Sequence, residues 1–262
     1  MRNLILKENT FISHDKSPIY YKSWENTQSK NAIILLHRGH EHSWRIAHLV
    51  DELSLDDMNF FAWDARWNGQ TQWKRWYAPD FSYLVKDLDV FVKHISEKYS
   101  IPVENIIIIA QSVWAVIAST WIHDYAPKIK WVVLASPAFN VNLIVPWAKQ
   151  VLQLWQKIKW DYVVKSYVKW KDLTHDLERS TSYHTDPLIC LDIYSNVLLE
   201  LYDHANRVVY DAWAIITPVL LLTSWDDKVV FKKEQEIFFK NLSSKLKEHH
   251  ILDWFYHDTL WE

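Results

Sequence analysis

A serine that follows a long apolar run is the strongest chemical signal in the sequence. Residues 106–110 are apolar throughout, as in a strand buried on both faces, and Ser112 comes two residues later. A pattern of small and apolar residues typical of a packed helix starts at Val113. A serine in such a strand–turn–helix projects its hydroxyl at the carboxyl edge of a sheet, where N–H groups can stabilise an oxyanion. The alternative interpretation is that Ser112 only caps the helix.

A nucleophilic serine needs an imidazole base and a carboxylate that orients the imidazole. Asp226 and Asp227 follow the apolar run at 219–223, and His257 follows a weaker run at 249–252. A nucleophile, an acid and a histidine, each just past a strand, occur in this chain order in α/β-hydrolases. The sequence therefore predicts acyl transfer by a serine, a histidine and one of these two aspartates.

The loop after the apolar run Ala32–Leu36 contains three histidines, His37, His40 and His42. Their spacing, His-x-x-His-x-His, could suit a metal site. We favour a different role, because a loop beside the nucleophile must form a tight turn that presents a backbone N–H to the oxyanion. No metal ion or cofactor is therefore expected.

Apolar runs that alternate with helical patterns indicate the elements that must position these groups. The clearest helix, at 80–99, carries one apolar stripe at helical spacing. Alternation of this kind predicts an α/β fold, with a mostly parallel central sheet and helices on both faces. Strands are expected at 10–13 and 18–24, as an opening antiparallel pair, and at 32–36, 59–63, 106–110, 131–135, 219–223 and 249–252; further helices are expected at 113–125 and 232–246.

One long segment interrupts the alternation. Residues 140–211 show several short helical patterns and no convincing strand. An insertion of this length between sheet strands is often a functional lid. We therefore expect a hydrolase core at 1–139 and 212–262 and a helical cap at 140–211.

Composition excludes several classes of protein. A net charge of −3 and a pI of about 6.5 indicate no large basic surface for nucleic acid. The single cysteine, Cys190, excludes an internal disulfide and fits a reducing compartment. No apolar run reaches the roughly 18 residues of a transmembrane segment. The expectation is a cytoplasmic protein that acts on a small molecule.

The motifs together resemble those of the monoacylglycerol lipase, lysophospholipase and serine aminopeptidase branch of the α/β-hydrolases, over nearly the whole chain. This resemblance implies that Ser112 is the nucleophile, Asp227 the acid and His257 the general base. It also implies that the backbone N–H groups of Gly39 and Val113 form the oxyanion hole. The matching segments are 37–45 (the oxyanion segment His-Gly-x-Gly-x-His-Ser), 64–69 (Asp-x-Arg-Gly-His-Gly), 110–114 (Gly-x-Ser-x-Gly), 136–137 (Ser/Ala-Pro), 186–188 (a cap signature), 227–230 (the acid motif) and 257–262 (the histidine motif).

The resemblance further implies a serine hydrolase that cleaves a carboxylic ester of a small lipid-like or acyl substrate through an acyl-enzyme. The cap at 140–211 would contact the acyl group. Thioesterase or peptidase activity on the same triad stays open, because a fold does not fix the substrate. The alternative from another class is a non-catalytic or inactivated α/β-hydrolase-fold module that binds without turnover.

The chain departs from the family mainly in one repeated way, with tryptophan where the family has glycine. It has two glycines and 17 tryptophans, and an indole in a glycine turn adds strain. We expect an altered version of a natural hydrolase sequence, altered by design or by substitution in the recorded sequence. Native aromatics are expected only at Trp24, Trp63 and Trp121; the clearest glycine positions are Trp44, Trp67, Trp114, Trp225 and Trp261, followed by Trp73, Trp76, Trp131, Trp213 and Trp254, and then by Trp147, Trp155, Trp160 and Trp170.

The end of the chain is the second departure. Five residues follow His257, whereas the resemblance implies a further helix that packs on the sheet. We therefore expect the natural protein to continue beyond Glu262, as a longer hydrolase or with another domain.

Overall fold

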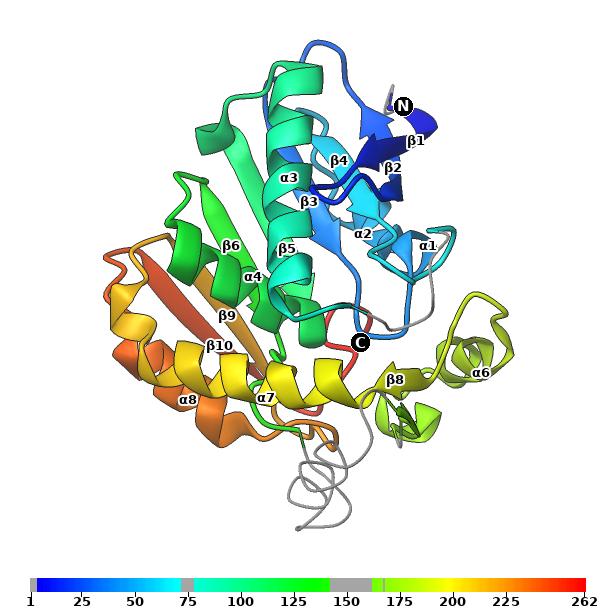
Figure 1. Ribbon diagram of the computed structural model, residues 1–262, viewed down its shortest axis with the longest axis vertical. Helices are drawn as coiled ribbons and strands as arrows, with labels where there is room; N and C mark the ends of the chain where they lie inside the picture. The colour runs from blue at the N-terminus through cyan, green and yellow to red at the C-terminus, as the bar shows by residue number, and fades with distance from the viewer. Residues whose placement is uncertain (1–3, 72–77, 142–161, 167) are drawn as a thin grey trace.

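The computed structural model describes residues 4–71, 78–141, 162–166 and 168–262. Its centre is an eight-stranded sheet with the strand order β1-β2-β4-β3-β5-β6-β9-β10 (Figure 1). β2 runs antiparallel to both β1 and β4, and the remaining neighbours are parallel. The expected α/β fold is confirmed. The strands of this sheet are β1 (Ile5–Ile12), β2 (Pro18–Glu25), β3 (Ala32–Leu36), β4 (Asn59–Trp63), β5 (Ile106–Gln111), β6 (Trp131–Ala135), β9 (Val219–Ser224) and β10 (Lys247–Leu252).

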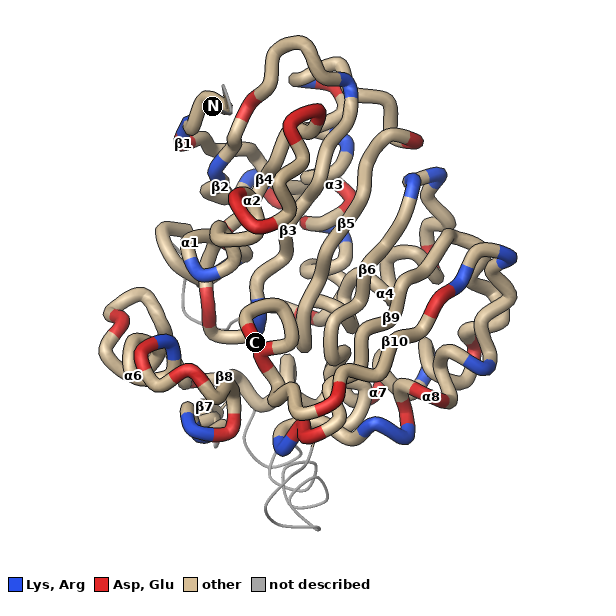
Figure 2. The backbone as a smooth tube through the Cα atoms, turned by 180° about the vertical axis from the view of Figure 1, so that it is seen from behind, with Lys and Arg blue, Asp and Glu red and all other residues tan. Residues whose placement is uncertain are grey.

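Helices cover the two faces of the sheet unequally. On one face α3 packs against α4, α4 against α7 and α7 against α8 (Figure 1). On the other face α1 and α2 lie over β3 and β4, and no described helix lies in front of β5, β6, β9 and β10 in Figure 2. Ile107 and Val133 are accordingly only half-buried there. Within the described residues the helices are α1 (Ser43–Ile46), α2 (His48–Glu52), α3 (Ser82–Tyr99), α4 (Val113–Tyr125), α6 (Leu177–Thr185), α7 (Ser195–Tyr210) and α8 (Lys232–Asn241), with short 3-10 turns at Val103–Asn105, Trp170–Asp172 and Ala212–Ala214.

Most bounds agree with the sequence-based expectation, and the exceptions have local causes. The strands at 32–36, 59–63 and 131–135 and the helix at 113–125 end where predicted. β1 starts at Ile5 rather than at residue 10, because the residues of this edge strand are mostly exposed and show no apolar pattern. α8 ends at Asn241 rather than at residue 246, and the following residues connect it to β10, which begins at Lys247.

The segment at 140–211 contains a strand pair that the sequence did not predict. β7 (Val163–Lys165) and β8 (Asp192–Tyr194) pair antiparallel, so the expectation of no strand in this segment was wrong. Strands of three residues are too short to show a two-residue periodicity. Residues 142–161 and 167 of the expected cap lie outside the described residues. No helix of the described ranges is long and apolar enough to cross a membrane.

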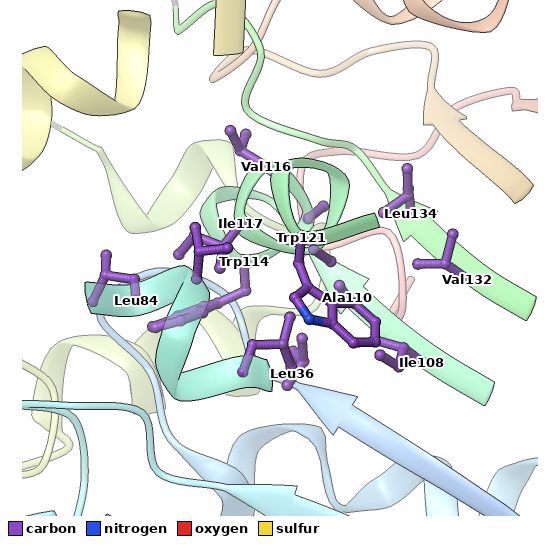
Figure 3. Packing of buried hydrophobic residues seen from close by; sticks show 14 of the residues in the cluster. Leu36, Leu84, Ile108, Ala110, Trp114, Val116, Ile117, Trp121, Val132 and Leu134 are labelled. Atoms are coloured by element: carbon purple, nitrogen blue, oxygen red, sulfur yellow. The ribbon is translucent and has the colours of Figure 1, made fainter. Parts of the chain in front are cut away.

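Trp114, at the first turn of α4, is packed into the larger apolar cluster of the core. Its ring meets Trp63 edge-on at 5.2 Å between centroids and His37 at 5.6 Å. Figure 3 shows it on α4 with Trp121 and close to Leu84 of α3. Its indole N–H has no hydrogen-bond partner among the described residues. The fold therefore buries this side chain without satisfying its polar atom.

Candidate active site

Ser112 lies in a turn whose position is fixed by the backbone, here called the serine turn (residues 111–114). β5 ends at Gln111 and α4 begins at Val113, so the chain reverses within one residue. Ser112 takes a strained backbone conformation with positive φ, at φ 57° and ψ −119°. Its N–H donates to Ala135 O at 3.0 Å, and Ala138 N–H donates to its carbonyl at 3.1 Å. These bonds hold the hydroxyl at the carboxyl edge of the sheet.

Three predicted site residues, far apart in the sequence, meet at this turn. His257 Nε2 lies 2.8 Å from Ser112 Oγ, and His257 Nδ1 lies 2.8 Å from Asp227 Oδ2. A proton on Nδ1 would be donated to Asp227, which leaves Nε2 to accept from the serine hydroxyl. Asp226, the alternative acid, instead uses its backbone N–H to bond Phe255 O at 3.1 Å. The imidazole therefore has the geometry of a base between a hydroxyl and a carboxylate.

The Asp227 carboxylate is buried and ionised. Burial alone would raise its pKa, but the facing His257 and the N–H groups of Val229 and Val230 hold the pKa of Asp227 below its ordinary value. Both N–H groups donate to Oδ1, at 2.8 and 3.0 Å, while Oδ2 faces the imidazole. Asp227 is thus held as an anion at neutral pH and can stabilise an imidazolium.

The loop that carries His257 is held by residues that the sequence analysis did not single out. Gln111 Nε2 donates to His257 O at 3.1 Å, and Thr259 Oγ1 donates to Ser136 Oγ at 2.7 Å. Asp258 receives bonds from Gln111 and from Arg179. Gln111 lies beside Ser112 in the sequence, and Asp258 and Thr259 follow His257. This adjacency was their only sequence signal, and it does not reveal which contacts they make.

The second half of the site is the oxyanion loop, defined as residues 37–45. It places Gly39 between β3 and α1, in a turn closed by a bond from Glu41 N to Arg38 O at 3.2 Å. Val113, the other expected N–H donor, is the first residue of α4, where helix geometry leaves the N–H without an intrahelical partner. Both donors expected for an oxyanion therefore lie at the same sheet edge as Ser112.

Side chains from elsewhere in the chain fix the oxyanion loop. Asp64 accepts from Ser43 N at 2.6 Å through Oδ1 and from Gln70 N at 2.7 Å through Oδ2. A Cβ at Gly69 would overlap the Asp64 carboxylate and the His42 side chain, so only glycine fits that position. The loop therefore depends on the turn after β4 for its shape.

The three histidines of the oxyanion loop each bond a different neighbour. His37 Nε2 accepts from Ala65 N, so its Nδ1 carries the proton and donates to Arg38 O at 2.7 Å. His40 bonds Cys190 O at 2.6 Å. His42 Nε2 lies 2.9 Å from Asp186 Oδ2. Within the part of the chain that the structure describes, no group of three His, Cys, Asp or Glu side chains could hold a metal ion.

Two of these histidines are neutral because they are buried. Burial lowers the pKa of His37 to about 4 and the pKa of His40 to about 4. For His40 the nearby charge of Arg38 acts in the same direction. At neutral pH both side chains are therefore uncharged parts of the loop.

Comparison with known proteins assigns the chain to a family. Residues 27–262 match the family model described as serine aminopeptidase, S33, so the chain belongs to this family of α/β-hydrolases. It is 47% identical over 257 residues to the uncharacterized protein YnbC of Escherichia coli (strain K12), covering 97% of this chain and 44% of the relative. The chain thus spans less than half the length of that relative.

More distant relatives are lipases by name. The monoglyceride lipase of Rattus norvegicus is 23% identical, with 94% of this chain and 82% of that protein covered. Among solved structures, the monoacylglycerol lipase of Paleococcus ferrophilus has a TM-score of 0.81 at 21% identity, covering 91% of this chain and 90% of the other. A soluble variant of monoglyceride lipase from Saccharomyces cerevisiae has a TM-score of 0.82 at 18% identity, covering 97% and 88%. The resemblance to the monoacylglycerol lipase branch of the α/β-hydrolases is confirmed.

Proposed function

We propose that the chain is a serine hydrolase that cleaves carboxylic esters of small lipid-like or acyl substrates through an acyl-enzyme. The observation that carries the proposal is the position of the His257 imidazole, 2.8 Å from Ser112 Oγ and 2.8 Å from Asp227. A hydroxyl, an imidazole and a buried carboxylate in this order are what nucleophilic catalysis by serine requires. The lipase names of the relatives support an ester as the substrate.

In the first step Ser112 Oγ attacks the ester carbonyl while His257 Nε2 takes the hydroxyl proton. The negative charge on the carbonyl oxygen would be met by the N–H groups of Gly39 and Val113. The imidazolium then donates its proton to the leaving alcohol, and Asp227 stabilises the positive ring meanwhile. In the second step water, deprotonated by His257, attacks the acyl-enzyme and releases the acid.

The substrate class rests on the insertion as well as on the relatives. We propose that the cap at 140–211 contacts the acyl group. In its described part, α6 reaches the oxyanion loop, because Arg45 Nη1 donates to Ser182 Oγ at 3.0 Å. The insertion therefore adjoins the proposed site and can influence which acyl group enters.

The test combines a covalent probe with an ester series. A fluorophosphonate should form an adduct on the peptide that contains Ser112, and p-nitrophenyl esters of increasing chain length should report the preferred acyl group. Ser112→Ala should lose both signals. An unlabelled wild-type protein with only the background rate of hydrolysis would overturn the proposal and favour the non-catalytic binding module. Faster cleavage of thioesters or aminoacyl amides than of esters would change the substrate class and keep the triad.

A further inference from the structure

Five buried charged side chains lie between the oxyanion loop, the insertion and the His257 loop. We call them the arginine cluster: Arg38, Glu41, Arg45, Arg179 and Asp258. None is more than 9% exposed. Figure 2 shows the C-terminal residues close to the loop that leads into α1, where the group sits. Three guanidinium groups here share two carboxylates.

The contacts of the arginine cluster join all three segments. Glu41 Oε1 accepts from Arg38 Nη2 at 2.8 Å and from Arg45 Nε at 2.6 Å, within the oxyanion loop. Asp258 Oδ2 accepts from Arg179 Nε at 3.3 Å and lies 3.6 Å from Arg38 Nη2. Arg179 also donates to Arg45 O at 2.6 Å, and Arg45 donates to Arg179 O at 3.2 Å. Arg38 contacts both carboxylates, and so does Arg179, whose Nη2 lies 4.0 Å from Glu41 Oε1.

Arg38 is a poor choice for stability alone. Its Nε and Nη1 have no hydrogen-bond partner among the described residues although they are buried. An arginine buried with donors unsatisfied costs free energy of folding. Arg38 also occupies the position of the first glycine in the family's oxyanion segment, His-Gly-x-Gly-x-His-Ser. Its presence therefore points to a role in the site.

Arg38 precedes Gly39 in the sequence, and Asp258 follows His257. An ion pair between the two side chains thus links the residue that would supply an oxyanion N–H to the residue that would act as base. We propose that Arg38 is a positioning residue that fixes the position of the Gly39 N–H relative to the His257 imidazole. Arg179 extends this link to the insertion. This inference rests on the proposed serine hydrolase function.

The cluster can lose Arg38 without leaving a carboxylate unpaired. Glu41 keeps Arg45, and Asp258 keeps Arg179. Burial would raise the pKa of Glu41, but the arginines around it, Arg38 first, hold that pKa well below its ordinary value. A variant without Arg38 should therefore fold, with its two catalytic loops less well aligned.

Glu25 provides a buried ion pair away from the proposed site. Glu25 is 7% exposed, at the end of β2. Its Oε2 accepts from Lys7 Nζ at 2.5 Å, and its Oε1 accepts from Ser23 Oγ at 2.8 Å. Glu25→Gln removes the charge from a buried ion pair in β1 and β2, outside the oxyanion loop, the turn after β4 and the His257 loop.

The experiment measures kcat and KM for one p-nitrophenyl ester, and the rate of fluorophosphonate labelling, in Arg38→Met, Arg38→Lys and Glu25→Gln. We expect Arg38→Met to lower kcat and the labelling rate by about 10- to 100-fold, as for a small misplacement of reacting groups. KM should stay within about threefold. Arg38→Lys should recover part of the loss, and Glu25→Gln should keep the wild-type kcat per folded molecule.

Three results would overturn the inference. The first is a wild-type kcat in Arg38→Met, and the second is an equal loss in Glu25→Gln. The third is a defect only in KM, which would assign Arg38 to substrate binding. A wild-type protein that neither labels nor turns over would instead overturn the proposed function itself. If Arg38→Met does not fold, Asp258→Asn tests the same ion pair, and a wild-type kcat in that variant overturns the inference.

A different observation concerns the tryptophans. Trp67 and Trp254 have φ of 63° and 66°, the region that favours glycine. Trp254 is 78% exposed and Trp225 is 51% exposed, so neither position needs an apolar side chain.

We infer that the cell which makes this protein places glycine at the tryptophans in glycine positions. The codon UGA accounts for such an exchange, because it is a stop in the standard genetic code and is assigned to tryptophan in some variant codes and to glycine in others. Translation of UGA as tryptophan would exchange these two residues and no others. It also explains why tryptophan, rather than a mixture of residues, occupies the turns.

The gene and the native protein test this inference separately. UGA should encode Trp67, Trp114, Trp225 and Trp254, whereas UGG should encode Trp63 and Trp121. Peptide mass spectrometry of the protein from its own cell should find glycine at the first group and tryptophan at the second. UGG codons throughout, or native peptides with tryptophan at Trp67 and Trp114, would overturn the inference.

Discussion

The serine turn and the oxyanion loop lie at the same sheet edge but are held there in different ways. The serine turn is fixed by backbone bonds to β6 and the segment after it, such as Ser112 N to Ala135 O. The oxyanion loop is fixed by side chains from the turn after β4, the insertion and the chain end, among them Asp64, Asp186 and Asp258. The first depends on strand–turn–helix geometry and the second on buried charges and neutral imidazoles.

This difference predicts different sensitivities. Chemistry at the serine turn should depend on the Ser112 hydroxyl itself and change little with its surroundings. The oxyanion loop should respond to pH and to distant substitutions, because its contacts include ionisable groups from three segments. The following four experiments test the comparison.

The largest effect should come from removing the nucleophile. Ser112→Ala should lower kcat for a p-nitrophenyl ester by about 10⁴- to 10⁶-fold, since no other group can form the acyl-enzyme. Ser119→Ala is the matched control, because Ser119 lies on the same helix and donates only to Ala115 O in the helix backbone. A residual rate in Ser112→Ala close to that of Ser119→Ala would refute the nucleophile assignment.

The acid should follow closely. Asp227→Asn should lower kcat by about 10⁴-fold, because an amide neither fixes the Nδ1–H tautomer nor stabilises an imidazolium. Asp226→Asn should retain nearly full activity, since the carboxylate that bonds His257 is that of Asp227. Steady-state kinetics of the two variants measure their kcat values. An equal loss of kcat in both would show that Asp226 and Asp227 share the role of the acid.

Acid should unfold the protein through the oxyanion loop. His37 and His40 have pKa values of about 4 in the folded protein against about 6.5 when unfolded. The unfolded state therefore binds more protons below pH 6.5, and stability is lost as pH falls from 6.5 to 4, with a slope approaching about 2.7 kcal/mol per pH unit for the two groups.

Urea unfolding as a function of pH measures that slope. His40→Asn should roughly halve it, because asparagine tolerates the φ of 70° at this position and does not titrate. Ser119→Ala, which removes no titratable group, serves as the control and should leave the slope unchanged. An unchanged slope in His40→Asn would mean that the loop does not carry the acid sensitivity.

The smallest effect should come from relieving a positive φ at a non-glycine residue away from the site. Trp254 precedes the His257 loop with φ 66° and is 78% exposed. Trp254→Gly should raise the free energy of unfolding by about 1–2 kcal/mol, the cost of a left-handed non-glycine residue. Trp213→Gly, equally on the surface but in a 3-10 turn without positive φ, should be neutral or slightly destabilising. Thermal unfolding of both compares them directly.

The sequence by itself determined the sheet, its strand runs and the serine turn. These features depend on local patterns: an apolar run at 106–110, a serine and a helix that starts at once. The order of acid and histidine after two later strands also predicted that His257 and one of Asp226 and Asp227 would reach the same edge, because parallel strands end there together. The family resemblance then selected Asp227.

Only the tertiary structure decided how the oxyanion loop is held. Arg38, Arg179 and Asp258 lie far apart in the sequence and show no common pattern, and their pairing follows from how the insertion and the chain end pack on the loop. The strand pair β7 and β8 was likewise invisible, since three residues carry no periodicity. Short-range backbone preferences can be predicted from sequence, whereas buried charge contacts form only when distant segments exclude water together.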